Sequence, residues 1–130
     1  MSDRLIKQLR EQRMSWVDLD PVADTEVPQS ERKRVRIIRP TEVEIATHLV
    51  VDGQVEVGFD AMRRFTVDWA GFSEADILGS AVGASDALPF SAAVWAEIAS
   101  DRVAWVRLVS NAILESAVAH HLKKEAALKN

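Results

Sequence analysis

Trp69-Ala70-Gly71-Phe72, followed after a spacer of small residues by Leu88-Pro89-Phe90-Ser91 and Trp95, is the stretch that decides the fold. It places several large aromatic rings and a clear helix start around one acidic connection that contains glycine. Ser91 is a good N-cap for that helix, because its side chain can accept a hydrogen bond from a free backbone N–H. The stretch contains no evident catalytic group. Large rings beside a helix start indicate packing and docking rather than chemistry.

Length and composition predict a small α+β protein. With 130 residues and no Cys, the chain fits one domain that needs neither disulfides nor thiolate metal sites. We expect residues 1–31 to form an N-terminal helix and an extended arm, and residues 32–130 to form a single domain, β-rich over 33–58 and α-helical over 59–125. No apolar run approaches the roughly 20 residues of a membrane span. No membrane contact is therefore expected, and the cytoplasm is the default location.

The charge is unevenly distributed along the chain, whose formal net charge is −4. Residues 1–39 carry nine Lys/Arg and seven Asp/Glu, whereas residues 40–100 carry two and ten. The densest basic run lies within 32–39, where Val35 and Ile37 alternate with arginines. This alternation is typical of a half-buried strand with a solvated polar face. This pattern argues against nucleic-acid binding, and a DNA-associated regulator that uses this basic run is the alternative.

The first forty residues contain three predicted features. Residues 3–14 can form a short amphipathic helix with Leu5, Ile6 and Leu9 on one side. Residues 18–31 contain two prolines and no glycine, which favours an extended tether. Trp16, at the start of the tether, should pin the arm to another surface. Residues 33–39 are the first predicted strand, which ends at Pro40.

Two patterns compete in the next segment. Thr41 and Glu44 have the spacing of a capping box, which predicts a helix. The apolar residues of 43–51 also alternate strictly and are mostly β-branched, and Asp52-Gly53 then precedes a second alternating run. Asp-Gly between two alternating runs is a strong hairpin signal. We therefore predict a hairpin of 43–51 with 54–58, with the helix as the alternative.

The C-terminal half is predicted to be helical. The expected helices share a capping signal at one end and cover residues 59–70, 73–79, 91–100 and 102–125. Gly71 is expected to end the first as a left-handed cap, Ser73 to begin the second, and Asp101 to cap the last. Phe90 lies directly before an N-cap, where it should form a hydrophobic staple with Trp95.

The last predicted helix is apolar on two sides. A helix of this kind is either central to a core or half of a protein interface. Its candidate interface residues are Trp105, Val106, Val109, Ile113, Leu114 and Val118. We expect concentration-dependent homo-oligomers through this helix. We also expect the acidic 42–76 surface or the N-terminal arm to meet a partner.

The residues that could carry chemistry are few. His120 and His121 are adjacent on a predicted helix, point about 100° apart and cannot share a metal ion. His121 and Glu125 come closest to a metal-ligand pair, and His48 has no evident nucleophile beside it. The glycines at 79 and 83 lack the Lys of a phosphate-binding loop. We therefore expect a non-enzymatic protein with no catalytic residue, cofactor or metal.

The order of motifs over residues 32–130 resembles the tail assembly chaperones of long-tailed bacteriophages and prophages. An arginine-rich strand ends at Arg39-Pro40-Thr41-Glu42, and a long helix reaches Lys129-Asn130. Between them lie the residues that best match the family pattern, which are Trp69, Gly71, Phe72, Leu88, Pro89, Phe90, Ser91 and Trp95. The longer spacer, with a helix at 73–79, departs from the expected pattern.

The resemblance implies a non-enzymatic assembly factor in the bacterial host cytoplasm. Such a protein would bind the phage tape-measure protein, recruit tail-tube subunits and be absent from the finished virion. A longer frameshifted form is also typical of the family, and Lys129-Asn130 is compatible with a slippery codon site. The alternatives are a structural head–tail connector, neck or other virion protein, or a small protein-interaction adaptor.

Overall fold

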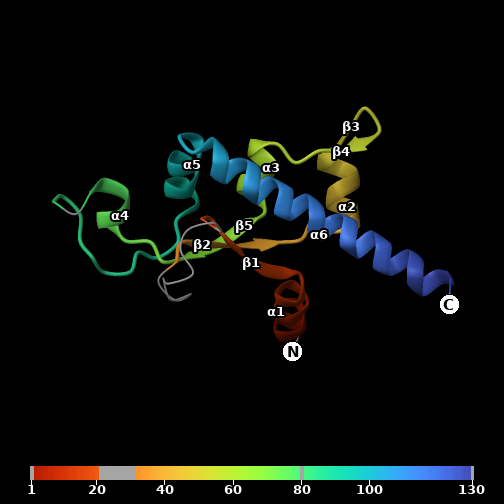
Figure 1. Ribbon diagram of the computed structural model, residues 1–130. Coiled ribbons are helices and arrows are strands. Elements are labelled where there is room, and N and C mark those ends of the chain that lie inside the picture. Colours follow the sequence, from red (N-terminus) through yellow and green to blue (C-terminus); the bar gives the residue numbers. More distant parts are fainter. Residues whose placement is uncertain (1, 21–31, 80, 130) are drawn as a thin grey trace.

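The computed structural model describes residues 2–20, 32–79 and 81–129 of the chain (Figure 1). A three-stranded antiparallel sheet lies in the N-terminal half, and the two longest helices after it lie in the C-terminal half. The α+β class predicted from the sequence is confirmed. The predicted tether over 18–31 falls mostly on residues 21–31, which lie outside the described residues.

The main sheet has the strand order β1-β2-β5, with bounds Met14–Asp18, Arg34–Ile38 and Thr66–Ala70. The central strand β2 confirms the strand predicted over 33–39. Strand β1 was not predicted, because its residues were assigned to the helix and the arm. It pairs with β2 along its whole length, so that Trp16 lies opposite Arg36. Trp16, predicted to hold the arm against another surface, does so as part of a strand that pairs with β2.

The two faces of the sheet differ in polarity. On β2, Val35 and Ile37 are buried, as the period of two requires. Arg34 and Arg36 point to the opposite face, where their guanidinium carbons lie 4.7 and 5.8 Å from the centre of the Trp16 ring. These cation–π contacts hold the basic run against the sheet. The half-buried strand predicted for this run is confirmed.

The segment after Pro40 is mostly helical, contrary to the predicted hairpin of 43–51 with 54–58. A short helix α2 (Glu42–Glu44) continues into a π-helix η2 (Ile45–Leu49). The capping box forms as its spacing indicates, because Thr41 Oγ1 accepts from the Glu44 N–H and Glu44 Oε1 accepts from the Thr41 N–H. The hairpin is limited to β3 (Val50–Val51) and β4 (Gln54–Val55), joined by Asp52-Gly53.

The helix predicted over 59–70 is also wrong in its second half. Helix α3 covers only Phe59–Arg64, and β5 follows from Thr66 as an edge strand of the main sheet. Gly71 has a φ of +81°, but it follows a strand and does not cap a helix. Its backbone passes so close to the Arg32 carbonyl that no side chain fits there. Gly71 is therefore needed for close packing of the chain against the start of β2.

Three helices complete the fold, namely α4 (Glu74–Leu78), α5 (Ala92–Ser100) and α6 (Val103–Lys129). The Ser73 and Ser91 side chains cap α4 and α5 as predicted, each accepting from the N–H three residues later. Asp101 does not have its predicted role. Its N–H bonds to the carbonyls of Ile98 and Ala99, so it ends α5, and α6 begins two residues later.

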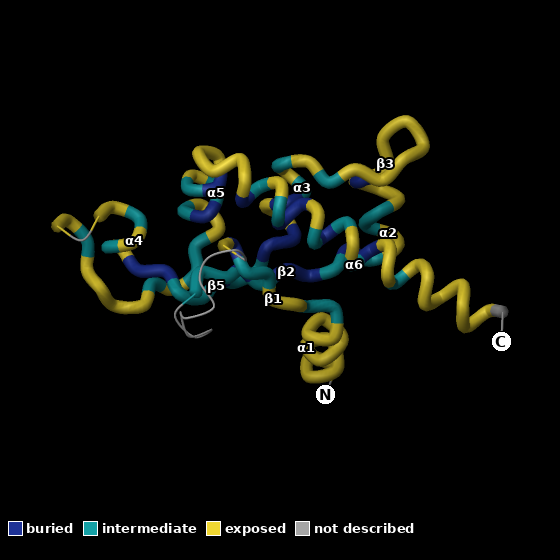
Figure 2. The backbone as a smooth tube through the Cα atoms, in the orientation of Figure 1, coloured by how far each residue is buried: buried dark blue, intermediate teal, exposed yellow. Residues whose placement is uncertain are grey.

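The core lies between the apolar face of the sheet and the helices α3, α5 and α6 (Figure 2). The first half of α6 crosses this core, and Val109 and Ile113 are fully buried. The second half continues beyond the body of the domain with exposed side chains (Figure 2). Helix α1 (Ser2–Gln12) also projects from the body, and it buries none of its residues. These two projecting segments leave apolar side chains outside the core.

Candidate protein-binding surfaces

The two motifs that decide the fold meet in one aromatic junction. The ring of Trp69 stacks on Phe72 with a centroid distance of 4.7 Å and meets Phe90 edge-on at 5.2 Å. Its indole N–H donates to the Leu88 carbonyl at 2.7 Å, and the Leu88 N–H donates to the Phe72 carbonyl at 2.8 Å. The junction therefore ties β5 directly to the segment that begins α5. This geometry is that of a structural element.

Trp95 lies deeper and has a different neighbour from the one predicted. Its ring is fully buried and stacks near Trp105 of α6, with centroids 6.3 Å apart. Phe72 approaches the other side of this pair, 6.2 Å from Trp105. Phe90, predicted to form a staple with Trp95, meets the Trp69 ring edge-on. The rings therefore join the sheet, α5 and α6 into one continuous cluster.

The candidate interface on the last helix is divided by the fold. Trp105, Val109 and Ile113 are buried in the core, so they are not free to bind a partner. Half of the predicted interface is therefore wrong. One of the two apolar sides of this helix packs into the core of its own chain. Val106 and Leu114 are partly buried. Val118 is 50% exposed, and it lies where α6 leaves the core.

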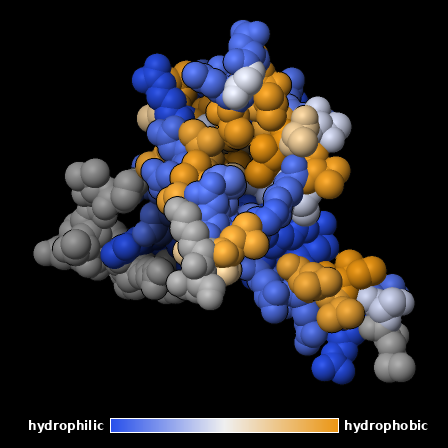
Figure 3. Space-filling view, turned by 90° about the vertical axis from the view of Figure 1, so that its right-hand side faces the viewer, coloured by the Kyte–Doolittle hydropathy of each residue, from blue (hydrophilic) through white to orange (hydrophobic). Residues whose placement is uncertain are grey.

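An apolar groove with a volume of about 410 Å³ lies between the second half of α6 and the α2–η2–hairpin segment. Its apolar lining comes from both sides and consists of Ile45, Ala46, Val50, Val55, Leu114, Ala117 and Val118. Figure 3 shows apolar side chains around a hollow in the upper part of this face. The size is that of a binding pocket for a few large side chains. The groove combines predicted interface residues of α6 with a wall from the acidic 42–76 segment, which was also expected to meet a partner.

One end of the groove is closed by charged residues from both walls. Glu42 of α2 accepts a hydrogen bond from Lys124 Nζ at 2.6 Å and lies 3.4 Å from His120 Nε2. The hydrogen bond from Lys124, with a further contribution from His120, lowers the pKa of Glu42. The carboxylate therefore holds α2 to α6 across 82 residues of sequence. Both side chains of this contact are more than half exposed, so it links the two walls at the surface.

Glu42→Gln should remove part of the acid sensitivity of the fold. Because folding lowers the Glu42 pKa, its contribution to stability is complete above the ordinary value of 4.5 and is lost as the pH falls through the lowered value. Glutamine keeps the shape but does not titrate. The difference between wild type and E42Q in urea midpoint should therefore shrink as the pH falls below 4.5. An unchanged difference between about pH 7 and about pH 3 would show that this contact does not stabilise the fold.

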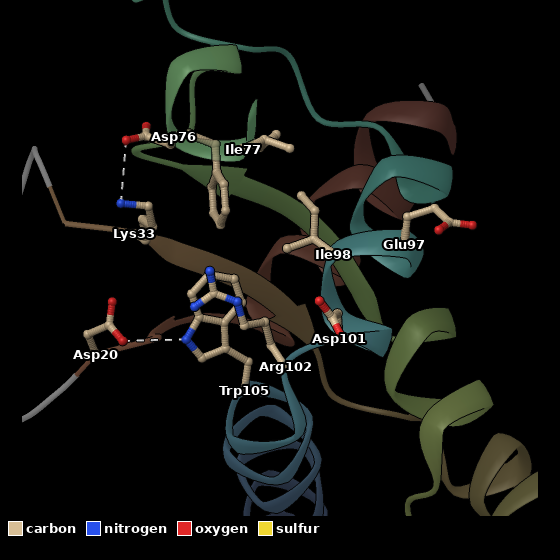
Figure 4. A pocket seen from close by; sticks show the side chains of 10 residues that line it. Asp20, Lys33, Asp76, Ile77, Glu97, Ile98, Asp101, Arg102 and Trp105 are labelled. Atoms are coloured by element: carbon tan, nitrogen blue, oxygen red, sulfur yellow. Dashed lines mark hydrogen bonds and ion pairs between the residues drawn. The ribbon is translucent and has the colours of Figure 1, made fainter. Parts of the chain in front are cut away.

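A second cleft, of about 420 Å³, lies at the other end of the core and has a mixed polar and apolar lining (Figure 4). Lys33 and Asp76 approach to 3.6 Å on one side, and Trp105 Nε1 donates to Asp20 at 3.4 Å on another. Burial alone would raise the pKa of Asp76, but hydrogen bonds from Ser73 and the nearby Lys33 ammonium outweigh it and lower the pKa. Lys33, Asp76, Asp20 and the Trp105 indole therefore have partners within the protein.

Helix α1 presents the other exposed apolar surface. Leu5, Ile6 and Leu9 are 57%, 55% and 52% exposed, although they form one face of the helix. The helix lies on the Arg36 side of the sheet, where Ile6 and Met14 border a shallow depression. The predicted amphipathic helix over 3–14 is thus confirmed in its position. Its apolar face has no covering partner among the described residues.

The histidines do not form a metal centre in the described residues, where no group of three His, Asp or Glu side chains is close enough to hold an ion. His121 Nε2 lies 3.1 Å from Glu125 Oε1 as an i,i+4 pair, and His120 belongs to the contact with Glu42. His48 is exposed in η2 at the edge of a small depression with Asp60 and Arg64.

None of the helices in the described part of the chain combines the length and apolar content that crossing a bilayer requires. Four of the eight residues singled out from the sequence, Trp69, Phe72, Leu88 and Phe90, make the direct contacts of the junction. Comparison of the chain with protein-family models, curated proteins and solved structures finds no match.

Proposed function

We propose that this protein is a non-enzymatic phage tail assembly chaperone, which binds an apolar helical segment of the tape-measure protein and recruits tail-tube subunits in the bacterial host cytoplasm. The observation that carries this proposal is the apolar groove between α6 and the α2–η2–hairpin segment. An apolar groove between structural elements is a common site for an amphipathic helix of a partner.

The build of the groove supports a role in holding a client segment. Val50, Val55 and Val118 remain 47%, 38% and 50% exposed beside a core that is closed without them. Exposed apolar side chains that gather in one groove indicate an interaction site more strongly than scattered ones. The contact of Glu42 with Lys124 joins the two walls of the groove at its surface in the absence of a partner. A preformed groove loses less conformational entropy on binding.

The resemblance in sequence supports the identity of the client. The residues that carry it include the junction of Trp69, Phe72, Leu88 and Phe90, which determines how the sheet joins α5 and α6. A shared junction therefore favours a shared arrangement of these elements, with the groove formed on the far part of α6. The tape-measure protein, a long helical rod, offers the apolar helical segments that such a groove fits.

The proposal is tested by co-expressing this protein with the tape-measure protein encoded by the same phage or prophage. We expect the wild type to keep the tape-measure protein soluble and to form a complex with it. Val118→Asp should weaken the complex at least about tenfold, because it places a charge at an apolar contact. Val82→Asp is the matched control, since Val82 is 75% exposed in a loop that does not line the groove.

Three results would contradict the proposal. Equal binding by V118D and V82D would remove the groove as the client site. Detection of this protein in purified virions by mass spectrometry would instead support a structural connector or neck protein, because an assembly chaperone is absent from the finished particle. A tape-measure protein that aggregates equally with and without this protein would rule out chaperoning.

A further inference from the structure

Helix α1 is an apolar surface that the described fold leaves uncovered. Its residues Leu5, Ile6 and Leu9 form one face and are all more than half exposed. The helix is nevertheless held in place, because it leads directly into β1 and because the neighbouring Arg13 donates to the Arg39 carbonyl at 2.7 Å. An isolated helix of eleven residues is marginal in water. Its apolar face is therefore expected to pack against another surface.

The apolar groove matches the apolar face of α1 in its chemistry. It is open, it is lined by aliphatic side chains from two elements, and its volume of about 410 Å³ accommodates a few large side chains rather than a whole domain. In Figure 1, α1 points away from the sheet on the side opposite α6, so α1 lies outside the groove of its own chain. Figure 3 shows that apolar side chains gather both around the hollow and in the lower part of the same face.

The segment that supplies one wall of the groove differs in charge from the basic residues of α1. Between Pro40 and Met62, this segment contains five acidic residues and no Lys or Arg, and of these five Glu42 lines the groove, next to Lys124 of α6. Helix α1 carries Arg4, Lys7 and Arg10, together with the acidic Asp3 and Glu11. None of the three basic residues has an ion-pair partner among the described residues. Opposite charges around an apolar contact favour correct docking and accelerate it.

We propose that this protein self-associates by inserting α1 of one copy into the apolar groove of a second copy. Leu5, Ile6 and Leu9 fill the groove, and the basic side chains of α1 face the acidic α2–η2–hairpin wall. The contact joins two different surfaces, so it forms a reciprocal dimer if both copies exchange α1 and an open chain if they do not. This self-association needs no client, and sedimentation of the protein alone tests it independently of the proposed function. Because both proposals use the same groove, α1 and a client segment would compete for it.

The proposal is tested by sedimentation velocity of the purified full-length protein over a range of concentrations. We expect wild type to form dimers or longer assemblies, and added salt to weaken them because it screens the charges. L5D/L9D and V118D should each raise the dissociation constant at least about tenfold. All three residues are at least half exposed, so both variants should keep the wild-type urea midpoint. Val82→Asp should associate as wild type does.

Mixing the two defective variants gives the decisive result. L5D/L9D keeps an intact groove and V118D keeps an intact α1, so together they should form a 1:1 complex through one remaining contact. Pairing of α1 with α1, or of α6 with α6, predicts no such rescue. Failure of the mixture to associate would overturn the proposal, as would a wild type that stays monomeric at high concentration or variants that assemble like wild type.

Discussion

Trp69→Ala is expected to lower the free energy of unfolding by about 3–5 kcal/mol, the usual cost of removing a large aromatic side chain from a core. Trp69 is only 5% exposed, and its ring contacts Phe72 and Phe90 on two sides. The substitution also leaves the Leu88 carbonyl without the indole N–H that it accepts. The loss therefore combines a cavity, two aromatic contacts and a hydrogen bond. Urea denaturation followed by circular dichroism measures it.

Trp16→Ala is the matched control for this prediction. Trp16 has the same side chain on the same sheet but is 41% exposed, and its main contacts are with the guanidinium groups of Arg34 and Arg36. Its removal should cost about 1 kcal/mol, as cation–π contacts at exposed sites do. A Trp69→Ala protein that is as stable as Trp16→Ala but has lost its client would show that the junction binds a partner and does not hold the fold.

The sequence predicted the junction better than it predicted the elements on either side. Phe59, Met62, Thr66 and Trp69 have the spacing of one helical face, which suggested that the helix beginning at Phe59 continues to Gly71. The structure places Thr66 to Ala70 in β5, because pairing with the central strand β2 outweighs the local helical period. A shift in register between Arg36 and Ile37 also disturbs the alternation of buried residues along β5. Local periodicity could not reveal a pairing with a strand thirty residues earlier.

The opposite error occurred after Pro40, where a local signal was correct and the longer pattern was misleading. The capping box of Thr41 and Glu44 forms. The alternating apolar pattern that begins at Val43 does not mark a buried strand face, since Val43 is 74% exposed. The same helical turn carries Glu42 and leads into the wall of the groove. Weighting the capping box more strongly would have revealed this wall. Its contact with Lys124 depends on tertiary structure and could not be predicted.

The division of α6 into a core part and a surface part likewise required the structure. The sequence identified its two apolar stripes and left open whether they served a core or an interface. Burial of Val109 and Ile113, against 50% exposure of Val118, shows that the first half belongs to the core and the second half to the groove. Apolar character alone does not distinguish these fates, because both require aliphatic side chains at helical spacing.

Gly71→Ala is expected to destabilise the fold by about 3 kcal/mol or more, because it combines backbone strain with a collision. An added Cβ would lie against the Arg32 carbonyl, 2.8 Å from its carbon and 3.2 Å from the Lys33 nitrogen. Relief requires the chain entering β2 to move. That movement would disturb the Lys33 carbonyl, which accepts from the buried Leu19 at 3.0 Å.

Gly53→Ala separates the collision from the strain. Gly53 has nearly the same φ, +78° against +81°, but nothing lies within 4 Å of an added Cβ. Its substitution should cost only about 1–2 kcal/mol, the penalty of a left-handed backbone for an ordinary residue. The difference between the two urea midpoints therefore measures the destabilisation caused by the collision alone, where the chain after β5 passes close to the start of β2. Equal destabilisation by both substitutions would mean that Gly71 is required for its φ alone, and that β2 can shift at no cost.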